Sequence, residues 1–429
     1  MPKAIRFFRS VPRWLLVRGL FPRYPAIATG ALSCIELAEA APPALPNAEW
    51  VRIRTRLSGV CGSDLSAIAC QGSPYFSPFV STPFVLGHEL VGDIVETGAA
   101  VPPQWKTGMR VVIEPALCCA VRGVTPPCRP CAAGEYAHCE NILKGCIKGG
   151  IQTGYCESTG GGWSAATLVV QHTQLHAVPE SLSAEEAVLA EPFACAVHAA
   201  LMAPREREAH VLFLGCGTIG LLAQYAYRAA GGQGHVLASA RFEAQAEMAR
   251  KFGGTGGDAR ATARNPEDCA TTEVLVGLGM ERLYKWVLER TGGSAHQPEL
   301  GKPVLLGGAD CVVDCVGSSR TIDDAMRLTR PRGTLVLAGM PGIPKGVDWT
   351  SVWYKALRVQ GSYAYGWETL SGGRKVKTLA LALELLQASG GALKPLVNRK
   401  YPLEEYRAAL AGAWQAGRNG GFKTVFEVE

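Results

Sequence analysis

The chain has 429 residues, of which 48% are hydrophobic, and a formal net charge of +6. This length suits about two to three domains. The charge is small for so long a chain and gives no reason to expect a nucleic-acid partner. No apolar run reaches the ~20 residues that span a bilayer, and no secretory signal pattern is found. We therefore expect a cytoplasmic protein without a membrane partner.

The first segment of the chain is basic. Six basic residues precede the first acidic residue, namely Lys3, Arg6, Arg9, Arg13, Arg18 and Arg23. An Arg-rich segment without acids is typical of a transit peptide, but this one lacks a Ser-rich composition and an obvious cleavage site. We interpret it as a solvated arm that leads into the first strands.

The two halves of the chain differ in pattern. Short apolar stretches broken by Gly and Pro make the first half β-rich, for example Trp50–Ile53, Leu90–Val95 and Arg110–Ile113. From residue 211 onward strands alternate with helices, which predicts an α/β unit with a doubly wound parallel sheet. The expected strands are 211–214, His235–Ser239, Cys311–Val316 and Thr334–Ala338, and the expected helices are Leu221–Ala230 and Phe242–Phe252.

One stretch of the second half departs from this alternation. Gly253–Gly308 contains a single amphipathic helix candidate, Met280–Arg290, and is otherwise polar. We interpret the stretch as an insertion into the nucleotide domain. Helical patterns return near the C-terminus, over Val376–Ala388 and Leu403–Gly417.

A G-x-G-x-x-G pattern follows the first strand of the second half. Its members are Gly215, Gly217, Thr218, Ile219 and Gly220, with Cys216 between the first two. The pattern alone is weak, but here it joins a strand to a helix, which is the context of a dinucleotide site. The glycines permit a tight turn, close approach to a pyrophosphate, and close packing of helix on strand. The helix N-terminus offers free N–H groups to the phosphates. The alternative is a Gly-rich turn without a ligand.

A cluster of cysteines predicts a structural metal site. Cys128, Cys131 and Cys139 supply three thiolates, and tetrahedral zinc needs four. Cys118 and Cys119 are both available as the fourth, and we favour Cys119. Four thiolates in a short polar segment of a cytosolic chain indicate zinc rather than disulfides or chance burial. Such a site leaves no position for a substrate.

A second set of potential ligands is spread along the chain. Cys61 lies in Gly-Val-Cys-Gly-Ser-Asp, His88 and Glu89 lie in Gly-His-Glu, and Glu191 precedes a proline. A thiolate, an imidazole and a carboxylate suit a catalytic zinc that keeps one position open. Each residue taken alone is equally compatible with a structural role.

Together these motifs, in this order, resemble the zinc-dependent medium-chain alcohol dehydrogenases. The Glu191-Pro192 form is similar to the sorbitol, threonine and glucose dehydrogenase branch. The resemblance implies a GroES-like β-rich catalytic domain, a Rossmann domain and a C-terminal return to the first domain. The implied limits are 1–197 with a zinc lobe at about 114–145, 198–355 with the insertion at 253–308, and 356–429.

The resemblance also implies roles for individual residues. Cys61 and His88 match zinc ligands, and either Glu89 or Glu191 supplies the acidic ligand. Asp64 matches the carboxylate that orients the ligand histidine. Ser63 matches the hydroxyl that takes the substrate proton.

Two positions depart from the family pattern. The family often has a histidine after the Ser-Asp pair, where this chain has Leu65 and Ser66, so the proton must leave by another route such as water. The usual first cysteine of the zinc lobe is replaced by Thr125.

The implied reaction is hydride transfer between an alcohol or polyol, or the matching aldehyde or ketone, and NAD(P), through a zinc-bound alkoxide. Two alternatives are an NADPH-dependent carbonyl or enoyl reductase of the same fold and a non-catalytic, zinc-stapled binding protein. The resemblance further implies two zinc ions per chain and a homo-oligomer, dimer or tetramer, paired near Thr334–Gly339 and the segment that follows.

The end of the second predicted strand favours NADP(H) over NAD(H). An acidic residue there, ~20 residues past the glycines, would bind the ribose of NAD. This chain has Ala240 at that place, followed by Arg241, whose guanidinium suits a 2′-phosphate, with Ser239 as a further donor. Glu243 is the nearest acid and argues against this preference. Alternatively, Arg241 is a solvated surface residue.

Overall fold

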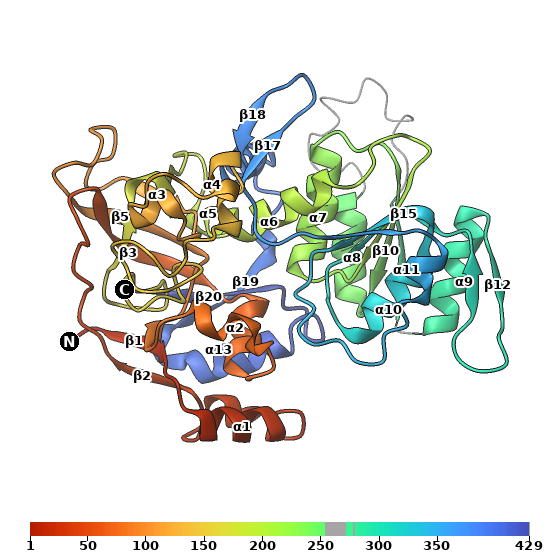
Figure 1. The fold of residues 1–429 in the computed structure, drawn as a ribbon, viewed down its shortest axis with the longest axis horizontal. Coiled ribbons are helices and arrows are strands. Elements are labelled where there is room, and N and C mark those ends of the chain that lie inside the picture. Colours follow the sequence, from red (N-terminus) through yellow and green to blue (C-terminus); the bar gives the residue numbers. More distant parts are fainter. Residues whose placement is uncertain (254–271, 278, 429) are drawn as a thin grey trace.

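The structure is a computed structural model that describes residues 1–253, 272–277 and 279–428. A seven-stranded, mainly antiparallel sheet organises the first part of the chain, in the order β19-β20-β3-β5-β6-β8 with β7 paired to β3. Its strands are β3 (Trp50–Gly59), β5 (Leu90–Thr97), β6 (Arg110–Ile113), β7 (Leu168–Gln171), β8 (Leu175–Ala177), β19 (Val397–Pro402) and β20 (Lys423–Glu427). The last strands of the chain thus complete the first sheet (Figure 1).

The basic N-terminal segment is folded rather than a solvated arm. β1 (Lys3–Phe7) pairs antiparallel with β2 (Ile35–Glu39) and with β4 (Phe84–Val85). Between β1 and β2 lie the helix α1 (Val11–Leu20) and a short 3-10 helix, Pro25–Thr29. The prediction of a solvated arm was wrong because apolar side chains such as Val17 give this segment a buried face.

The second sheet confirms the expected doubly wound fold. Its six described strands are all parallel and lie in the order β11-β10-β9-β14-β15-β16, which is the 3-2-1-4-5-6 order of dinucleotide-binding domains. The strands are β9 (His210–Leu214), β10 (His235–Ala240), β11 (Thr272–Val276), β14 (Ala309–Asp314), β15 (Thr329–Leu337) and β16 (Arg358–Gly361). The inner strands β9, β10 and β14 are short and mostly buried because helices cover both faces of the sheet, whereas the edge strand β16 is mostly exposed.

Helices connect and cover these strands. On one side lie α6 (Ala190–Leu201), α7 (Thr218–Ala229), α8 (Glu243–Gly253) and α12 (Thr378–Ala388), and on the other α9 (Met280–Thr291) and α10 (Ser319–Leu328). The remaining helices and strands are α2 (Gly62–Ile68), α3 (Cys119–Arg122), α4 (Arg129–Ala133), α5 (Ala184–Ala187), α11 (Thr350–Tyr354), α13 (Tyr406–Trp414), β12 (Ser294–His296), β13 (Val304–Leu306), β17 (Trp367–Thr369) and β18 (Lys375–Lys377). The helices α6 and α7 lie side by side between the two sheets (Figure 1). Their buried side chains join those of both sheets in one continuous apolar core.

Part of the stretch interpreted as an insertion belongs to the sheet. β11 pairs in parallel with β10, and α9 packs its buried Leu283 and Val287 on the sheet. The β12–β13 hairpin follows α9 as an addition. Residues 254–271 of the expected insertion lie outside the described residues.

β16 forms one edge of the second sheet and β11 forms the other. Thr334 and Leu337, in the expected oligomer contact, lie on β15, one strand inside the β16 edge. Of the expected oligomer contact, the strand residues thus lie inside the sheet, and the segment after Gly339, which leads into β16, is the part at the edge where a second copy would pack. Among the described residues, no helix is both long and apolar enough to cross a bilayer.

Candidate functional site

Neighbouring strands bring the expected ligands Cys61, His88 and Glu89 together. Ser58 of β3 pairs with Leu90 of β5, so the end of β3 lies beside the start of β5. One ligand atom from each of the three residues lies within 4.8 Å of the others. His88 and Glu89 are almost fully buried. The sheet register thus explains why residues 27 positions apart form one cluster.

Gly87 allows the chain to turn into this cluster. Its φ is +95°, a left-handed conformation that favours glycine, and an added Cβ would lie 2.4 Å from the Trp163 ring. The Trp163 indole N–H in turn donates to the Gly59 carbonyl at 3.0 Å. A side chain at residue 87 would therefore displace the backbone that carries His88.

Asp64 lies where a residue that orients His88 should lie. Its Oδ1 is 3.4 Å from His88 Nδ1, and its Oδ2 accepts a hydrogen bond of 3.0 Å from the Cys61 backbone N–H. Burial alone would lower the pKa of His88, but Asp64 and the Cys61 sulfur raise that pKa well above its usual value. One carboxylate thus fixes both the start of α2 and the imidazole.

Glu191 is close to the cluster but not within it. It lies in the first turn of α6, buried, with its Oε1 3.7 Å from the Cys195 sulfur. Burial raises its pKa to about 7, a rise that His88 opposes and Glu89 reinforces. Of the two acids expected as third ligand, the structure places Glu89 in the compact group.

Two residues near the cluster were not found from the sequence. Lys423, buried at the start of β20, forms an ion pair with Glu89 and donates to the Val60 carbonyl at 3.1 Å. The Tyr155 hydroxyl donates to Asp64 at 3.3 Å and lies beside the half-buried Ser63. Burial, followed by the charge of Asp64, raises the pKa of Tyr155 well above 10, so the phenol keeps its proton.

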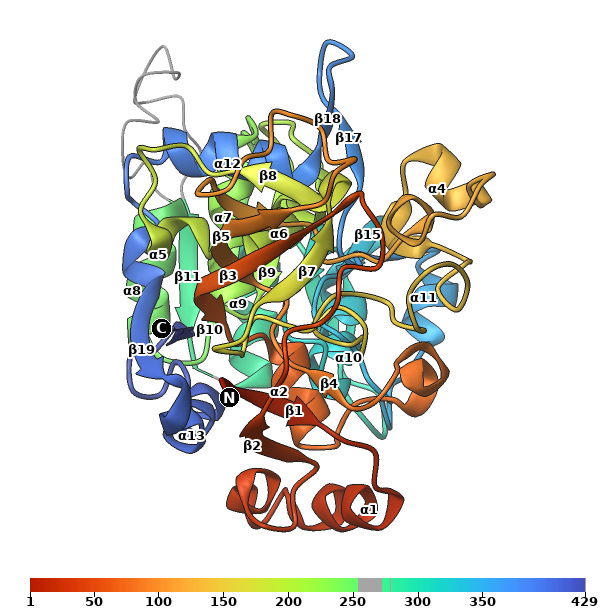
Figure 2. The same cartoon turned by 90° about the vertical axis from the view of Figure 1, so that its left-hand side faces the viewer.

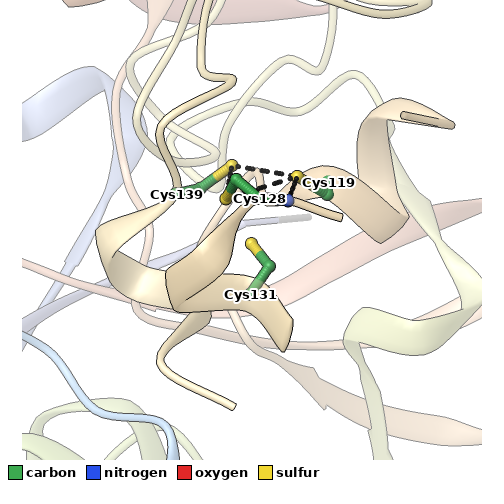
Figure 3. A group of neighbouring side chains, drawn as sticks. All are labelled: Cys119, Cys128, Cys131 and Cys139. Carbon is green, nitrogen blue, oxygen red and sulfur yellow. Dashed lines mark hydrogen bonds between the residues drawn. The ribbon is translucent and has the colours of Figure 1, made fainter. Parts of the chain in front are cut away.

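The second metal group contains Cys119, Cys128, Cys131 and Cys139, and Figure 3 shows their sulfurs gathered between α3 and α4. The Cys119 sulfur is 3.6 Å from those of Cys128 and Cys139, which are 3.9 Å apart. Cys118 is absent from the metal-binding groups of the described residues. The geometry thus selects Cys119 over Cys118.

Within this lobe the Cys128 thiol ionises most readily, whereas burial raises the pKa of Cys131 and Cys139. Burial raises the pKa of Cys128, but hydrogen bonds from the backbone of Glu140 and from Cys131 outweigh it and leave the pKa at about 7. The thiolate, which is the metal-binding form, is therefore accessible near neutral pH. A third residue that the sequence did not reveal, the buried Arg122, donates to the backbone carbonyls of Leu117, Lys144, Ile147, Lys148 and Gly150. It holds the lobe together.

The glycine motif joins β9 to α7 as expected. Gly217 is the N-terminal cap of α7, and Gly215 has a φ of +93°. An added Cβ at Gly220 would lie 1.8 Å from the Gly215 carbonyl oxygen, so only glycine fits there. Thr218 Oγ1 donates to the Phe422 carbonyl at 3.1 Å, which ties this turn to the residue before Lys423. Ile219 follows in the first turn of α7.

The expected phosphate-binding residues lie at the end of β10. Ser239 is half-buried, and its carbonyl accepts from the Gly215 N–H at 3.0 Å. Arg241 is exposed, with its guanidinium over the Phe242 ring at 5.2 Å. Glu243, the acid that argued against NADP, forms an ion pair of 2.8 Å with Arg250.

Comparisons with known proteins agree with this arrangement. Residues 47–180 match the family described as alcohol dehydrogenase GroES-like domain, and residues 218–376 match that of zinc-binding dehydrogenase. A probable D-xylulose reductase A of Arthroderma otae is 29% identical over 89% of this chain and 91% of its own length. An L-threonine 3-dehydrogenase of Streptomyces coelicolor is also 29% identical, over 90% and 94%.

Solved structures share the fold. The 2R,3R-butanediol dehydrogenase from Bacillus subtilis has a TM-score of 0.69 at 20% identity, covering 100% of both chains. A putative zinc-binding dehydrogenase from Sinorhizobium meliloti, solved with NADP, has a TM-score of 0.65 at 21% identity, covering 99% of both chains. The two family matches and the two curated relatives show that the chain belongs to the zinc-dependent medium-chain alcohol dehydrogenases and is a hydride-transferring oxidoreductase that uses zinc and a nicotinamide cofactor.

Proposed function

We propose that the enzyme interconverts a small alcohol or polyol and its carbonyl form with NADP(H), using a zinc ion held by Cys61, His88 and Glu89. The observation that carries this proposal is the group formed by a half-buried thiol, a buried imidazole and a buried carboxylate within 4.8 Å. That donor set is the one a catalytic zinc with an open position takes. A zinc ion there supplies Lewis acidity, which lowers the pKa of an alcohol.

The chain's own residues then have distinct tasks. Asp64 holds the His88 ring by its Nδ1 side, which leaves Nε2 as the ligand nitrogen. Ser63 takes the hydroxyl proton, and the Tyr155 hydroxyl, which lies against both Ser63 and Asp64, is the next group on its way out. Tyr155 thus occupies the relay position that the family often gives to a histidine. Glu191, whose pKa the charge of Glu89 helps to raise, is the alternative acidic ligand.

We place the cofactor across the turn Gly215–Gly220. The third glycine lets α7 start close to β9, so that its N-terminal N–H groups face the pyrophosphate. The two curated relatives are named for D-xylulose and L-threonine, both small polar molecules. A cofactor-reduction screen over alcohols, polyols and aldehydes tests the proposal. A measurable rate with a small polar alcohol is expected, and no turnover of any class would contradict it.

We expect NADP to be the preferred cofactor because Arg241 is exposed at the end of β10 and no described carboxylate forms an ion pair with it, while Glu243 is paired with Arg250. Replacing Arg241 with Ala removes charge-assisted hydrogen bonds to the 2′-phosphate, each worth about 1.5–3 kcal/mol. The ratio of kcat/KM for NADP to that for NAD should fall about tenfold or more. Lys251→Ala, which removes an exposed cation near the far end of the helix α8 that follows Arg241, should leave the ratio unchanged. A wild type that prefers NAD, or an unchanged ratio in Arg241→Ala, would refute the assignment.

We also propose that copies of the chain pair through the β16 edge. An open edge strand exposes unpaired backbone groups, and the preceding segment exposes Trp349, Trp353 and Tyr354, with Trp353 83% exposed. Light scattering should give a multiple of the 45.5 kDa chain mass. Trp353→Glu should shift the mass toward the monomer, whereas Leu143→Glu, at an exposed position of the zinc lobe, should not. A monomeric wild type would rule out this interface.

A further inference from the structure

Residues 8–34 form an excursion from the β1–β2 hairpin, and it lies outside both family matches. Phe7 pairs with Ile35, and the Phe8 N–H donates to the Cys34 carbonyl at 3.0 Å. The two ends of the excursion therefore lie side by side at the end of the hairpin. Hairpin connections are commonly two to five residues long. Figures 1 and 2 both draw α1 at an outer margin of the molecule. Nothing in the proposed chemistry uses this excursion.

The inner side of the excursion is well anchored. Val17 is fully buried, and the Phe21 ring contacts the Trp414 ring at a centroid distance of 5.2 Å. Arg13 donates to the carbonyls of Ala31 and Ser33, and Arg18 donates to those of Cys70 and Gly72. The arginines of α1 thus turn toward the protein, which is the reverse of an ordinary surface helix.

The outer side is almost wholly apolar. The exposed residues of the excursion are Arg9, Val11, Pro12, Leu15, Leu16, Gly19, Leu20, Pro22, Arg23, Tyr24, Pro25, Ala26, Ala31 and Leu32. Only Arg9 and Arg23 among them are charged, and both are basic. Within α1 the exposed positions recur about one turn apart, so they share one side of the helix. Val11 and Leu15 are 63% and 59% exposed.

Positive charge surrounds this apolar face. No acidic residue occurs before Glu36, which pairs with Arg6. Arg9, Arg13 and Arg18 donate to backbone carbonyls, which hold a guanidinium without neutralising it. No carboxylate of the described residues forms an ion pair with these three or with Arg23. The face therefore combines exposed leucines with uncompensated cations.

We propose that this excursion docks the enzyme on an anionic lipid surface. The α1 face enters the boundary between headgroups and acyl chains, Arg9 and Arg23 meet the lipid phosphates, and Tyr24 lies at headgroup level. A second copy fits the face less well. A stable protein interface uses about 20–30 residues a side, more than the fourteen exposed here, and two such basic faces repel. This proposal departs from the sequence-based expectation of no membrane partner, because adsorption to one leaflet needs no spanning helix.

Vesicle co-sedimentation tests the proposal with full-length protein. Wild type should bind phosphatidylcholine vesicles that contain about 30 mol% phosphatidylserine, bind pure phosphatidylcholine vesicles several-fold less, and lose affinity as salt rises. Leu15→Gln combined with Leu16→Gln should weaken binding by at least about tenfold, because two side chains that enter the lipid become polar. Arg23→Gln should weaken binding to the anionic vesicles alone, by about fivefold.

The matched control is Leu300→Gln with Leu306→Gln, two exposed leucines on the β12–β13 hairpin and its connection, which should bind as wild type does. Thermal melting checks that every variant is folded, so the result does not depend on dehydrogenase activity. If the Leu15→Gln, Leu16→Gln variant does not fold, Arg23→Gln and the salt titration still test whether the excursion binds anionic vesicles. Absence of wild-type binding, or equal loss in both double variants, would overturn the proposal. A change of mass in the α1 variant without vesicles would also overturn it, because the face would then be a contact between copies.

Discussion

Cys61→Ser and His88→Ala are each expected to abolish turnover while cofactor binding stays intact. The two side chains belong to the compact group at the ends of β3 and β5, whereas Gly215–Gly220 lie on the other sheet. Metal polarisation of a reacting oxygen contributes several kcal/mol to the transition state, which corresponds to a loss in kcat of roughly a thousandfold or more. NADPH binding, followed by its fluorescence, should change by less than about twofold.

His172→Ala provides the matched control, since His172 is half-buried on the same sheet's periphery and outside the metal groups of the described residues. It should keep near wild-type turnover. Retained activity in Cys61→Ser or His88→Ala would contradict the assignment of these residues. A loss of cofactor binding together with turnover would instead indicate a general folding defect.

Cys128→Ser or Cys131→Ser is expected to destabilise the protein strongly without touching the reacting groups. A metal held by four thiolates contributes its binding energy to folding, so losing one ligand lowers the free energy of unfolding by roughly several kcal/mol. The Tm should fall by on the order of 5–10 °C, measured by calorimetry. Elemental analysis should drop from two zinc ions per chain in wild type to one in the variants.

Cys118→Ser is the control that the chain itself offers. Cys118 precedes Cys119 directly but is not among the grouped sulfurs, so this variant should keep both the metal content and the Tm of wild type. If Cys128→Ser melted like wild type, or Cys118→Ser lost a zinc ion, the ligand set of the lobe would be wrong.

The nucleotide half was predictable because its signals are local. Residues 211–240 alternate between short apolar strands and a Gly-rich turn, and β9, α7 and β10 form as that pattern predicts. The thiol cluster was predictable for the same reason, since its members are close in sequence. The strand β11 was missed although it reads Thr-Glu-Val-Leu-Val, because it is only five residues long and the sequence around it is polar.

The remaining parts of the site depend on pairings that no local pattern encodes. Lys423 reaches Glu89 only because β20 pairs with β3 in a register that sets Val425 against Gly59. Tyr155 reaches Asp64 from 91 residues away, out of a loop without a motif. The apolar outer face of α1 was missed because its arginines, read as solvated, turn inward to backbone carbonyls.

The most direct test of the account follows metal content and turnover in the same sample. Wild-type protein should contain two zinc ions per chain. Brief chelation should remove the ion at the open site held by Cys61, His88 and Glu89 before the one enclosed by four thiolates. Turnover of the best substrate from the screen should fall in proportion to the first ion lost and return when zinc is added. Full turnover by protein that holds one zinc ion or none would contradict the account.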